Sequence, residues 1–466
     1  MIAAPFLHRS IFIAKKDREK ILMSFTALSR LCVFAAVALL SMASSLLLTS
    51  RAALAEPFPP GAQSDNVKQI GFSSLGGKFG GFKIAIKHTA NDKWYLYTGH
   101  SFNQGWSIVD VTDPANPRYV KFIPYVTDDK SIITSQVTLH DNLMLTSLNS
   151  FTPQKNPLPA VLLWDISDPE NPKQVGSWMG GVTGAHRNSY PGGKYAYLST
   201  SYPGFKSNIM VILDVSDPAH PKDIGKWWQP GQKDGEPPSQ YPEGFHGPVN
   251  VSPDGKWASL PYTPDVVNLD LTDPTNPKLI GRLHITEPFA SVGIQSVHTV
   301  LPLWDRNLLY VSSEAHDENC ADNGMNFAGM IDNSNNAHPK LISIFPPPVP
   351  PKDAPYRDFC DKGGRFGPHN VSQEIHNPAI QKPGKLMTVA WFNAGVRIFD
   401  ISDARLPKEV GYFMPPERPN LPDQSGAHAS KVDWSEEIAV DARGSIYMND
   451  DKWGLFILRY TGKEPK

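Results

Sequence analysis

The sequence contains little cysteine and little charge, and neither sign of charge dominates. Only 3 of its 466 residues are Cys, 19% are charged, and the formal net charge is -2. Proteins that bind nucleic acid by neutralising phosphates carry an excess of Lys and Arg, so we expect no nucleic-acid partner. The chain also lacks a P-loop, a dinucleotide-binding glycine pattern, a Gly-x-Ser-x-Gly turn and a His-Glu-x-x-His motif. No common catalytic motif therefore assigns its chemistry.

The abundant residue types favour an all-β protein. The chain has 44 Pro and 35 Gly, and 10% of its residues are aromatic. Pro and Gly concentrate in turns, and many turns between short strands are typical of all-β domains. The hydrophobic fraction of 40% is large enough to build a core, which excludes global disorder.

The N-terminal region predicts export. Residues 31–50 contain no charged residue, and a small-x-small cleavage pattern follows at 53–55. This arrangement is typical of a secretory signal peptide, which we place at 1–55, with Met23 as an alternative start. The alternative is an uncleaved anchor, because the apolar run approaches the length that spans a bilayer; membrane contact is expected only in that case. Cleavage would leave 56–466 as a periplasmic or secreted protein.

The two cysteines of the expected mature chain are Cys320 and Cys360. A pair of cysteines in an oxidising compartment favours one disulfide. A copper site built from the two thiolates is the alternative.

A phrase of the form Asp-Val-Ser-Asp-Pro-x-x-Pro recurs along the chain at intervals of 49 to 68 residues, a period typical of propellers and solenoids. Asp and Ser side chains can accept hydrogen bonds from nearby backbone N–H groups and prolines fix φ, so the phrase predicts a tight turn between two strands. Two further strands precede the turn in several units, which gives the four strands of a propeller blade. The first aspartates of the copies are Asp110, Asp165, Asp214, Asp270, Asp332 and Asp400.

The two ends of the chain predict how the ring closes. The segment 67–71 matches the last strand of a blade, as at 173–176, but stands alone. The C-terminal unit ends with a third strand at 454–460 and has no fourth strand after it. We therefore predict a single domain over 56–466, a seven-bladed β-propeller closed by an N-terminal strand that completes the last blade and leaves no free edge.

The recurring phrase resembles that of the LVIVD-repeat proteins, a family of exported bacterial β-propellers. The resemblance covers most of 67–460 and implies the propeller fold. The family has no single agreed activity, so the resemblance implies little about function.

One face of the expected propeller carries the long insertions, and we call it the long-loop face. It combines the connections between blades with the connections between the second and third strands of each blade. Irregular loops on a rigid scaffold are a usual place for binding groups. A disulfide between Cys320 and Cys360 would join two of these loops. The insertions are 228–244, 313–326, 346–367 and 415–426.

Five units place a histidine at the start of their first strand, where side chains can converge on the channel. Imidazole is the commonest metal ligand at neutral pH, and several histidines on separate strands could hold iron, copper or zinc with an open position. Carboxylates such as Glu314 could orient the rings. We assign His186, His246, His298 and His369 as metal ligands, and His428 and Glu314 as catalytic groups, His428 being alternatively a fifth ligand.

Other interpretations of the histidines remain open. In WD-repeat propellers a histidine at this position bonds within its own blade, and a structural His–Asp network would suit the spacing here. The arrangement is also similar to the channel metal sites of carotenoid cleavage oxygenases, and to the selenium-binding protein and methanethiol oxidase family, at the level of the fold. Arg187, next to His186, could hold an anionic ligand or pair with an acid.

These observations lead to two function hypotheses. The first is an exported, metal-dependent oxidoreductase that acts on a small-molecule substrate through the channel histidines. The second is a non-enzymatic binding or scaffold module that presents its long-loop face to a protein or a glycan.

Overall fold

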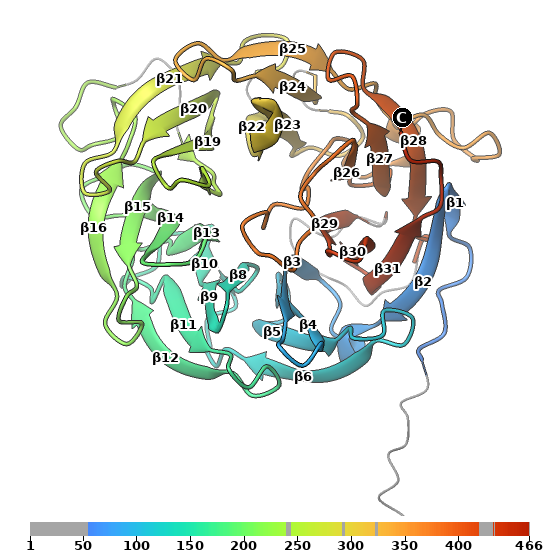
Figure 1. Ribbon diagram of the computed structural model, residues 1–466, viewed down its shortest axis with the longest axis horizontal. Helices are drawn as coiled ribbons and strands as arrows, with labels where there is room; N and C mark the ends of the chain where they lie inside the picture. The colour runs from blue at the N-terminus through green and yellow to red at the C-terminus, as the bar shows by residue number, and fades with distance from the viewer. Residues whose placement is uncertain are drawn as a thin grey trace, which may run out of the picture. The chain divides into compact units, whose positions relative to one another are not determined.

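The computed structural model describes residues 55–238, 244–290, 294–321, 325–418, 432 and 434–465. This part of the chain is almost entirely β-structure and forms a seven-bladed β-propeller, as predicted (Figure 1). The expected signal peptide lies outside the described residues except for its last position, so export stays a prediction. Among the described residues no helix is long and apolar enough to cross a membrane. The helical segments are η1 (Leu75–Gly77), η2 (Trp304–Arg306) and α2 (Phe359–Lys362).

The first three blades follow the expected strand order, with the first strand of each blade nearest the axis and the fourth at the rim (Figure 1). Blade 1 contains β3 (Gly81–His88), β4 (Trp94–His100), β5 (Gly105–Asp110) and β6 (Arg118–Pro124). Blade 2 contains β8 (Val137–His140), β9 (Leu143–Ser147), β11 (Val161–Asp165) and β12 (Lys173–Trp178), with a separate pair formed by β7 (Ile132–Ile133) and β10 (Asn149–Ser150). Blade 3 contains β13 (Ala185–Ser189), β14 (Tyr195–Ser201), β15 (Asn208–Asp214) and β16 (Lys222–Trp227).

The next three blades are less regular at their inner edges. In blade 4 two short strands, β17 (Gly244–Phe245) and β18 (Asn250–Val251), both pair with β19 (Trp257–Thr263), followed by β20 (Asp265–Asp270) and β21 (Lys278–His284). Blade 5 contains β22 (Ile294–Leu303), β23 (Leu308–Ala315), β24 (Ala328–Asp332) and β25 (Lys340–Ile344). Blade 6 contains β26 (Leu386–Ala390), β27 (Val396–Asp400) and β28 (Lys408–Met414), and its inner position is held by a single bridge from Val371 to Val389.

The last blade closes the ring as the sequence predicted. It contains β29 (Ser435–Val440), β30 (Ser445–Asp450) and β31 (Gly454–Tyr460), and its fourth strand is the N-terminal β2 (Val67–Ser73). The strands β2 and β31 are antiparallel, with Val67 opposite Tyr460 and Ser73 opposite Leu455. An additional strand, β1 (Gln63–Asp65), pairs with β28 of blade 6. The N-terminal segment therefore joins two neighbouring blades, and the sequence did not predict this second contact.

The recurring phrase forms the expected turn between the third and fourth strands. In blade 3, Asp214 ends β15 and accepts a hydrogen bond from the backbone N–H of Ser216 at 2.9 Å. Hydrogen bonds from Ser216 lower the pKa of Asp214. The same bond recurs in the other copies, so each repeat aspartate stabilises its own turn. The equivalent pairs are Asp110 with Thr112, Asp165 with Ser167, Asp270 with Thr272, Asp332 with Ser334, and Asp400 with Ser402.

Glycine in the fourth strand lets neighbouring blades approach closely. A Cβ atom at Gly225 of β16 would clash with the carbonyl oxygen of Pro274, which belongs to the turn of the next blade. Gly176 of β12 has the same relation to Pro218. The outer strands and the turns thus form a tight seam around the rim, while apolar side chains fill the space between blades, for example Tyr197, Ile212 and Leu260 between blades 3 and 4.

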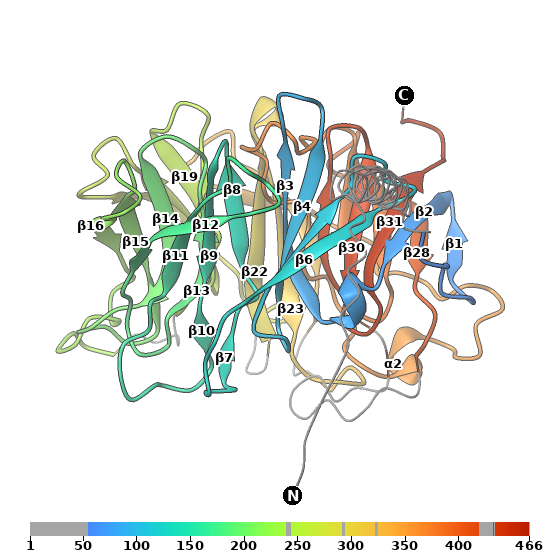
Figure 2. The ribbon, with the colours of Figure 1, turned by 90° about the horizontal axis from the view of Figure 1, so that it is seen from below.

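Cys320 and Cys360 form a disulfide, which confirms the expected pairing. The two sulfur atoms are therefore not a pair of copper-binding thiolates. Cys320 follows β23 and Cys360 lies in α2, so the disulfide joins two segments of the long-loop face. Seen edge-on, α2 and the β7–β10 pair lie at the same end of the blades (Figure 2).

Candidate metal site on the propeller axis

Four of the five expected histidines lie next to one another in the structure. His186 lies on β13 and His298 on β22, His246 directly follows β17, and His369 precedes β26. Their ring centroids are 4.7 Å apart for His186 and His246, 3.9 Å for His246 and His298, and 4.7 Å for His298 and His369. Blades 3 to 6 therefore each contribute one imidazole. His428 lies outside the described residues, and its expected role stays a prediction.

Bulges in the inner strands bring consecutive side chains into this group. The register of β13 against β14 shifts between Ala185 and Arg187, which leaves His186 without a partner in the ladder. In a regular strand, successive side chains point to opposite faces, but a bulge changes their direction. Here His186 contacts His246, while Arg187, the next residue, contacts His298. The bulge thus lets one strand supply two neighbouring groups to the site.

The Nδ1 atom of each ring has an acceptor in the surrounding structure. Nδ1 of His246 lies 2.9 Å from the Gly247 carbonyl oxygen, and Nδ1 of His369 lies 2.8 Å from the Glu436 carbonyl oxygen. Because a carbonyl oxygen only accepts, Nδ1 carries the hydrogen in both rings. Such contacts fix the orientation and tautomer of metal-binding histidines, and leave Nε2 as the ligand atom.

The other two rings are held in the same way. Nδ1 of His298 lies 2.8 Å from Oγ1 of Thr299, whose hydroxyl donates to the His369 carbonyl oxygen at 3.1 Å. Nδ1 of His186 lies 3.3 Å from Oδ1 of Asn149, whose amide NH₂ donates to the Thr183 carbonyl oxygen at 2.9 Å. Both acceptors are thereby oriented toward the ring, so all four Nε2 atoms are without hydrogen when the rings are neutral.

Burial keeps the rings neutral. It lowers the pKa of His186 to about 3, assisted by Arg187, and lowers that of His369 to about 3. Burial also holds the pKa values of His246 and His298 well below their usual value. Nε2 of His186 lies only 2.9 Å from Nε2 of His246. When both rings are neutral, with their hydrogens on Nδ1, the lone pairs of these two nitrogens point toward each other.

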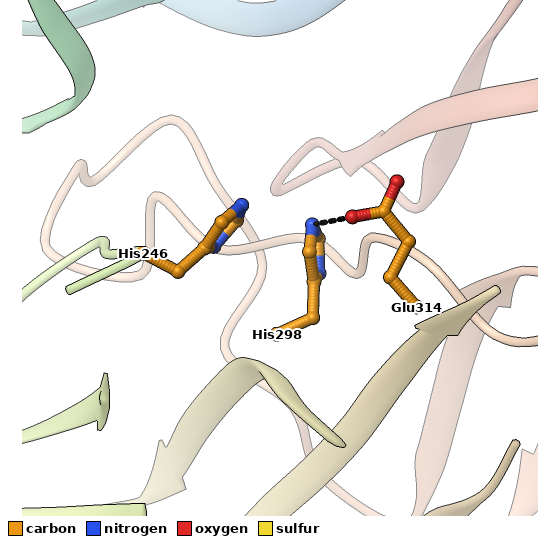
Figure 3. A group of neighbouring side chains, drawn as sticks. All are labelled: His246, His298 and Glu314. Carbon is orange, nitrogen blue, oxygen red and sulfur yellow. Dashed lines mark ion pairs between the residues drawn. The ribbon is translucent and has the colours of Figure 1, made fainter. Parts of the chain in front are cut away.

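Glu314, on β23, supplies a carboxylate to the same site. Oε2 of Glu314 lies 3.3 Å from Nε2 of His298 (Figure 3). Oε1 of Glu314 lies 3.7 Å from Nε2 of His369. Burial by itself would raise the pKa of Glu314, but its histidine neighbours, including the hydrogen-bonded His316, outweigh this effect and hold the pKa well below its usual value. Arg365 also contacts the carboxylate, with Nη1 at 3.3 Å from Oε1.

The geometry of these groups suits a metal ion. One ligand atom from each of His246, His298 and Glu314 lies within 4.8 Å of the other two. Two ligand atoms on opposite sides of one ion are about 4 Å apart, since each lies about 2.0–2.2 Å from the metal. Small side-chain movements would therefore bring the three atoms into coordination, and His186 and His369 flank them on either side (Figure 3 shows the central three).

The remaining blades place other polar side chains on the axis, and the sequence analysis did not identify most of them. Lys83 of blade 1 donates to Oε1 of Gln373 at 2.9 Å and lies 3.5 Å from Glu437 of blade 7. Burial raises the pKa of Glu437 to about 7 and that of its neighbour Glu436 to about 8. Gln136 of blade 2 is buried directly before β8. A blade-by-blade comparison of first-strand starts could have found the glutamates.

The four axial histidines do not form a structural network with the repeat aspartates. Their nitrogen atoms contact one another, Glu314 and the acceptors described above, whereas the repeat aspartates bond their own turns. His100 shows what a structural histidine looks like in this fold. It is fully buried, with Nε2 at 2.8 Å from Oγ of Ser107 and Nδ1 at 3.2 Å from the Phe79 carbonyl oxygen.

Comparison with known proteins agrees with the fold. The model of the LVIVD repeat matches residues 192–227, which span β14 to β16 of blade 3. The protein is thus a seven-bladed β-propeller of repeated blades. The match confirms the resemblance to the LVIVD-repeat family, since the chain contains an LVIVD repeat.

Solved structures with a similar fold are distant in sequence. The β-propeller domain of Cps50 (Swd1) from Myceliophteria thermophila is 10% identical, with a TM-score of 0.49 over 81% of this chain and 96% of that chain. A functionally unknown protein from Desulfotomaculum acetoxidans DSM 771 is 13% identical, with a TM-score of 0.46 over 72% of this chain and 85% of that chain. No curated protein matches the sequence. Neither structure assigns a function to this chain.

Proposed function

We propose that this protein is an exported, metal-dependent oxidoreductase that acts on a small molecule at the axial histidine cluster. The ligands are Nε2 of His186, His246, His298 and His369, with Glu314 as a further ligand or as the group that accepts a proton from the substrate. One observation carries the proposal: the Nε2 atoms of His186 and His246 lie 2.9 Å apart, while the Nδ1 contacts of both rings favour the tautomers that leave Nε2 without hydrogen.

Two nitrogen lone pairs at this distance repel each other unless a cation lies next to both. A hydrogen between the two Nε2 atoms would require one ring to be protonated or to carry its hydrogen on Nε2. Burial lowers the pKa of both rings far below neutrality, and the Nδ1 contacts favour the tautomer with the hydrogen on Nδ1. A metal ion has no such requirement, because it binds neutral imidazole. The Nδ1 contacts of both rings support the same interpretation, since they resemble the outer contacts that orient metal-binding histidines.

The set of donor atoms narrows the choice of ion. Several imidazoles with a carboxylate suit iron, copper or zinc, and the ion's identity sets the chemistry. Iron or copper held in this way would supply electron transfer and an open position for a substrate. The protein's own residues fix the rings through their Nδ1 contacts, and hold the Glu314 carboxylate between His298 and Arg365. The disulfide between Cys320 and Cys360 supports a periplasmic or secreted location.

Metal analysis of the mature chain tests the proposal. The protein, residues 56–466, is purified from an export-competent host without an affinity His tag, and its metal content is measured. We expect one equivalent of iron or copper, lost in a His246→Ala/His298→Ala variant. A His220→Ala/His338→Ala variant removes the same number of imidazoles from exposed turns and should retain the metal. Absence of metal, even after reconstitution with each ion, would contradict the proposal.

A second candidate function has support on the long-loop face. The Phe151 side chain is 76% exposed in the connection between β10 and β11, and that of Val349 is 74% exposed in the insertion 346–367. Exposed apolar side chains that form a contiguous patch are typical of surfaces that bind a partner. A metal-free protein that binds a protein or a glycan through these loops, and loses binding in a Phe151→Ser variant, would favour the binding-module hypothesis.

A further inference from the structure

We propose that Arg187 binds the carboxylate of a small, singly charged organic anion, and that this anion is the substrate of the axial site. The inference rests on the proposed function and names the substrate class of the same site.

The first observation is the burial of an arginine without a counter-ion. Arg187 is 2% exposed, and no described carboxylate oxygen lies within 4.0 Å of its guanidinium nitrogens. A buried charge is costly unless it is paired and fully hydrogen-bonded. Arg397 shows the usual arrangement in the same protein, since it is equally buried and its Nη1 lies 3.0 Å from Oε1 of Glu409.

The second observation is that hydrogen-bond donors of Arg187 are unused. Its Nη2 donates to Oδ1 of Asn370 and to Nε2 of His298, both at 3.3 Å. Nε and Nη1 are buried and have no hydrogen-bond partner among the described residues. A guanidinium group carries five N–H donors, and leaving buried donors unpaired destabilises the folded protein. An acceptor from outside the chain would remove this destabilisation.

The position of Arg187 relates its free donors to the metal site. Because Nη2 contacts Nε2 of His298, the guanidinium lies beside the atom that we assign as a metal ligand. Because of the bulge in β13, the side chains of both His186 and Arg187 contact the axial histidines. An anion bound by Nε or Nη1 would therefore hold the rest of its molecule next to the ion. Arg187 touches the substrate in this arrangement and fixes its orientation.

The surrounding charges favour a single negative charge. Carboxyl groups lie on the histidines beside Arg187: Oε2 of Glu314 is 3.3 Å from Nε2 of His298, and Oε2 of Glu436 is 3.3 Å from Nδ1 of His369. These carboxyl groups are close enough to interact but do not pair with the guanidinium. They would repel a phosphate dianion more strongly than a carboxylate. Arginine donors match a carboxylate well, so the best candidate is a small organic acid.

Formate binding tests the inference, with formamide as a neutral probe of the same size. Binding to the mature protein is measured by titration calorimetry, together with the metal content of each sample. We expect saturable binding of formate and none of formamide. An Arg187→Gln variant should bind formate at least about tenfold more weakly, because it loses charge-assisted hydrogen bonds. An Arg397→Gln variant loses an equally buried arginine and should bind formate like the wild type.

Several results would overturn the inference. These are the absence of formate binding to the wild type, equal binding of formamide, or unchanged affinity in Arg187→Gln. If Arg187→Gln does not fold, as judged by circular dichroism, Arg187→Lys takes its place. Lysine keeps the charge but loses the planar donor geometry, so its affinity should fall and an unchanged affinity would contradict the inference.

The same samples separate this inference from the proposed function. Arg187-dependent formate binding by a protein that never holds metal would retain the anion site and reject the metal-dependent activity. A protein that holds metal through the histidines, but binds formate independently of Arg187, would retain the metal site and reject the role of Arg187.

Discussion

The rim and the axis of this propeller both contain residues that recur in several blades, but the recurrence has different consequences. At the rim, Asp214 and its equivalents each accept a backbone hydrogen bond within their own turn. On the axis, His186, His246 and their equivalents contact one another. A repeat aspartate at the rim bonds within its own turn, whereas a histidine near the axis meets its copies from other blades.

This comparison shows how a repeat protein can combine stability with a shared site. The rim positions are occupied by residues that solve a local problem, such as a turn or the close seam at Gly225. The axial positions contain groups whose partners come from other blades. We therefore expect substitutions at the rim to change the free energy of unfolding, and substitutions on the axis to change ligand binding.

The strongest effect at the rim is expected for Gly225→Ala. The added Cβ would clash with the Pro274 carbonyl oxygen, and a backbone atom in a seam cannot move away easily. We expect the free energy of unfolding to fall by roughly 3–5 kcal/mol. Chemical denaturation of the variant and the wild type measures the change.

Gly384→Ala is the matched control for this substitution. A Cβ atom at Gly384 would have no atom within 4 Å, so its effect should stay within about 0.5 kcal/mol. Equal stability of the two variants would show that the seam does not hold the blades together.

Substitution of a histidine away from the axis should change the free energy of unfolding and leave the metal content unchanged. Burial lowers the pKa of His100 to about 4, from a usual value of 6.5. The unfolded chain therefore binds more protons between these two pH values, and stability is fully present above pH 6.5 and is lost as the pH falls toward 4. The difference corresponds to about 3 kcal/mol.

A His100→Gln variant tests this dependence. Between pH 7 and about pH 4 it should lose roughly 3 kcal/mol less stability than the wild type, and its metal content should equal that of the wild type. Denaturation curves at the two pH values measure the first quantity. Loss of metal in this variant would break the distinction between axial and structural histidines.

The smallest effect is expected for a single repeat aspartate. Asp214→Ala removes the acceptor for the Ser216 N–H, a contact similar to a helix cap, and should cost about 1 kcal/mol. Metal content and formate affinity should not change, because Asp214 does not contact the axial groups. A change in either quantity would show that rim and axis are coupled.

Much of this structure could be predicted from local sequence patterns. The turn phrase is a local hydrogen-bonding arrangement, so its recurrence predicted the blades, and the unmatched strands at 67–71 and 454–460 predicted the closure. The grouping of four histidines followed from their common position in the blade. The disulfide followed from the cysteine count and the expected compartment.

Other features depend on contacts between distant segments and could not be predicted. The pairing of β1 with β28 adds a strand that the repeat does not contain. The bulge that brings both His186 and Arg187 to the site is a register shift with no clear signal in the sequence. The missing counter-ion of Arg187, in contrast to the pairing of Arg397 with Glu409, depends on side chains from several blades.

The central claim is that a metal ion lies between the Nε2 atoms of the axial histidines. Anomalous diffraction from crystals of the metal-containing protein, recorded on both sides of the absorption edge of the ion found by metal analysis, locates it directly. The account predicts one peak about 2.0–2.2 Å from Nε2 of at least three of the four histidines. A peak elsewhere, or an empty cluster in crystals of protein that contains metal, would contradict it.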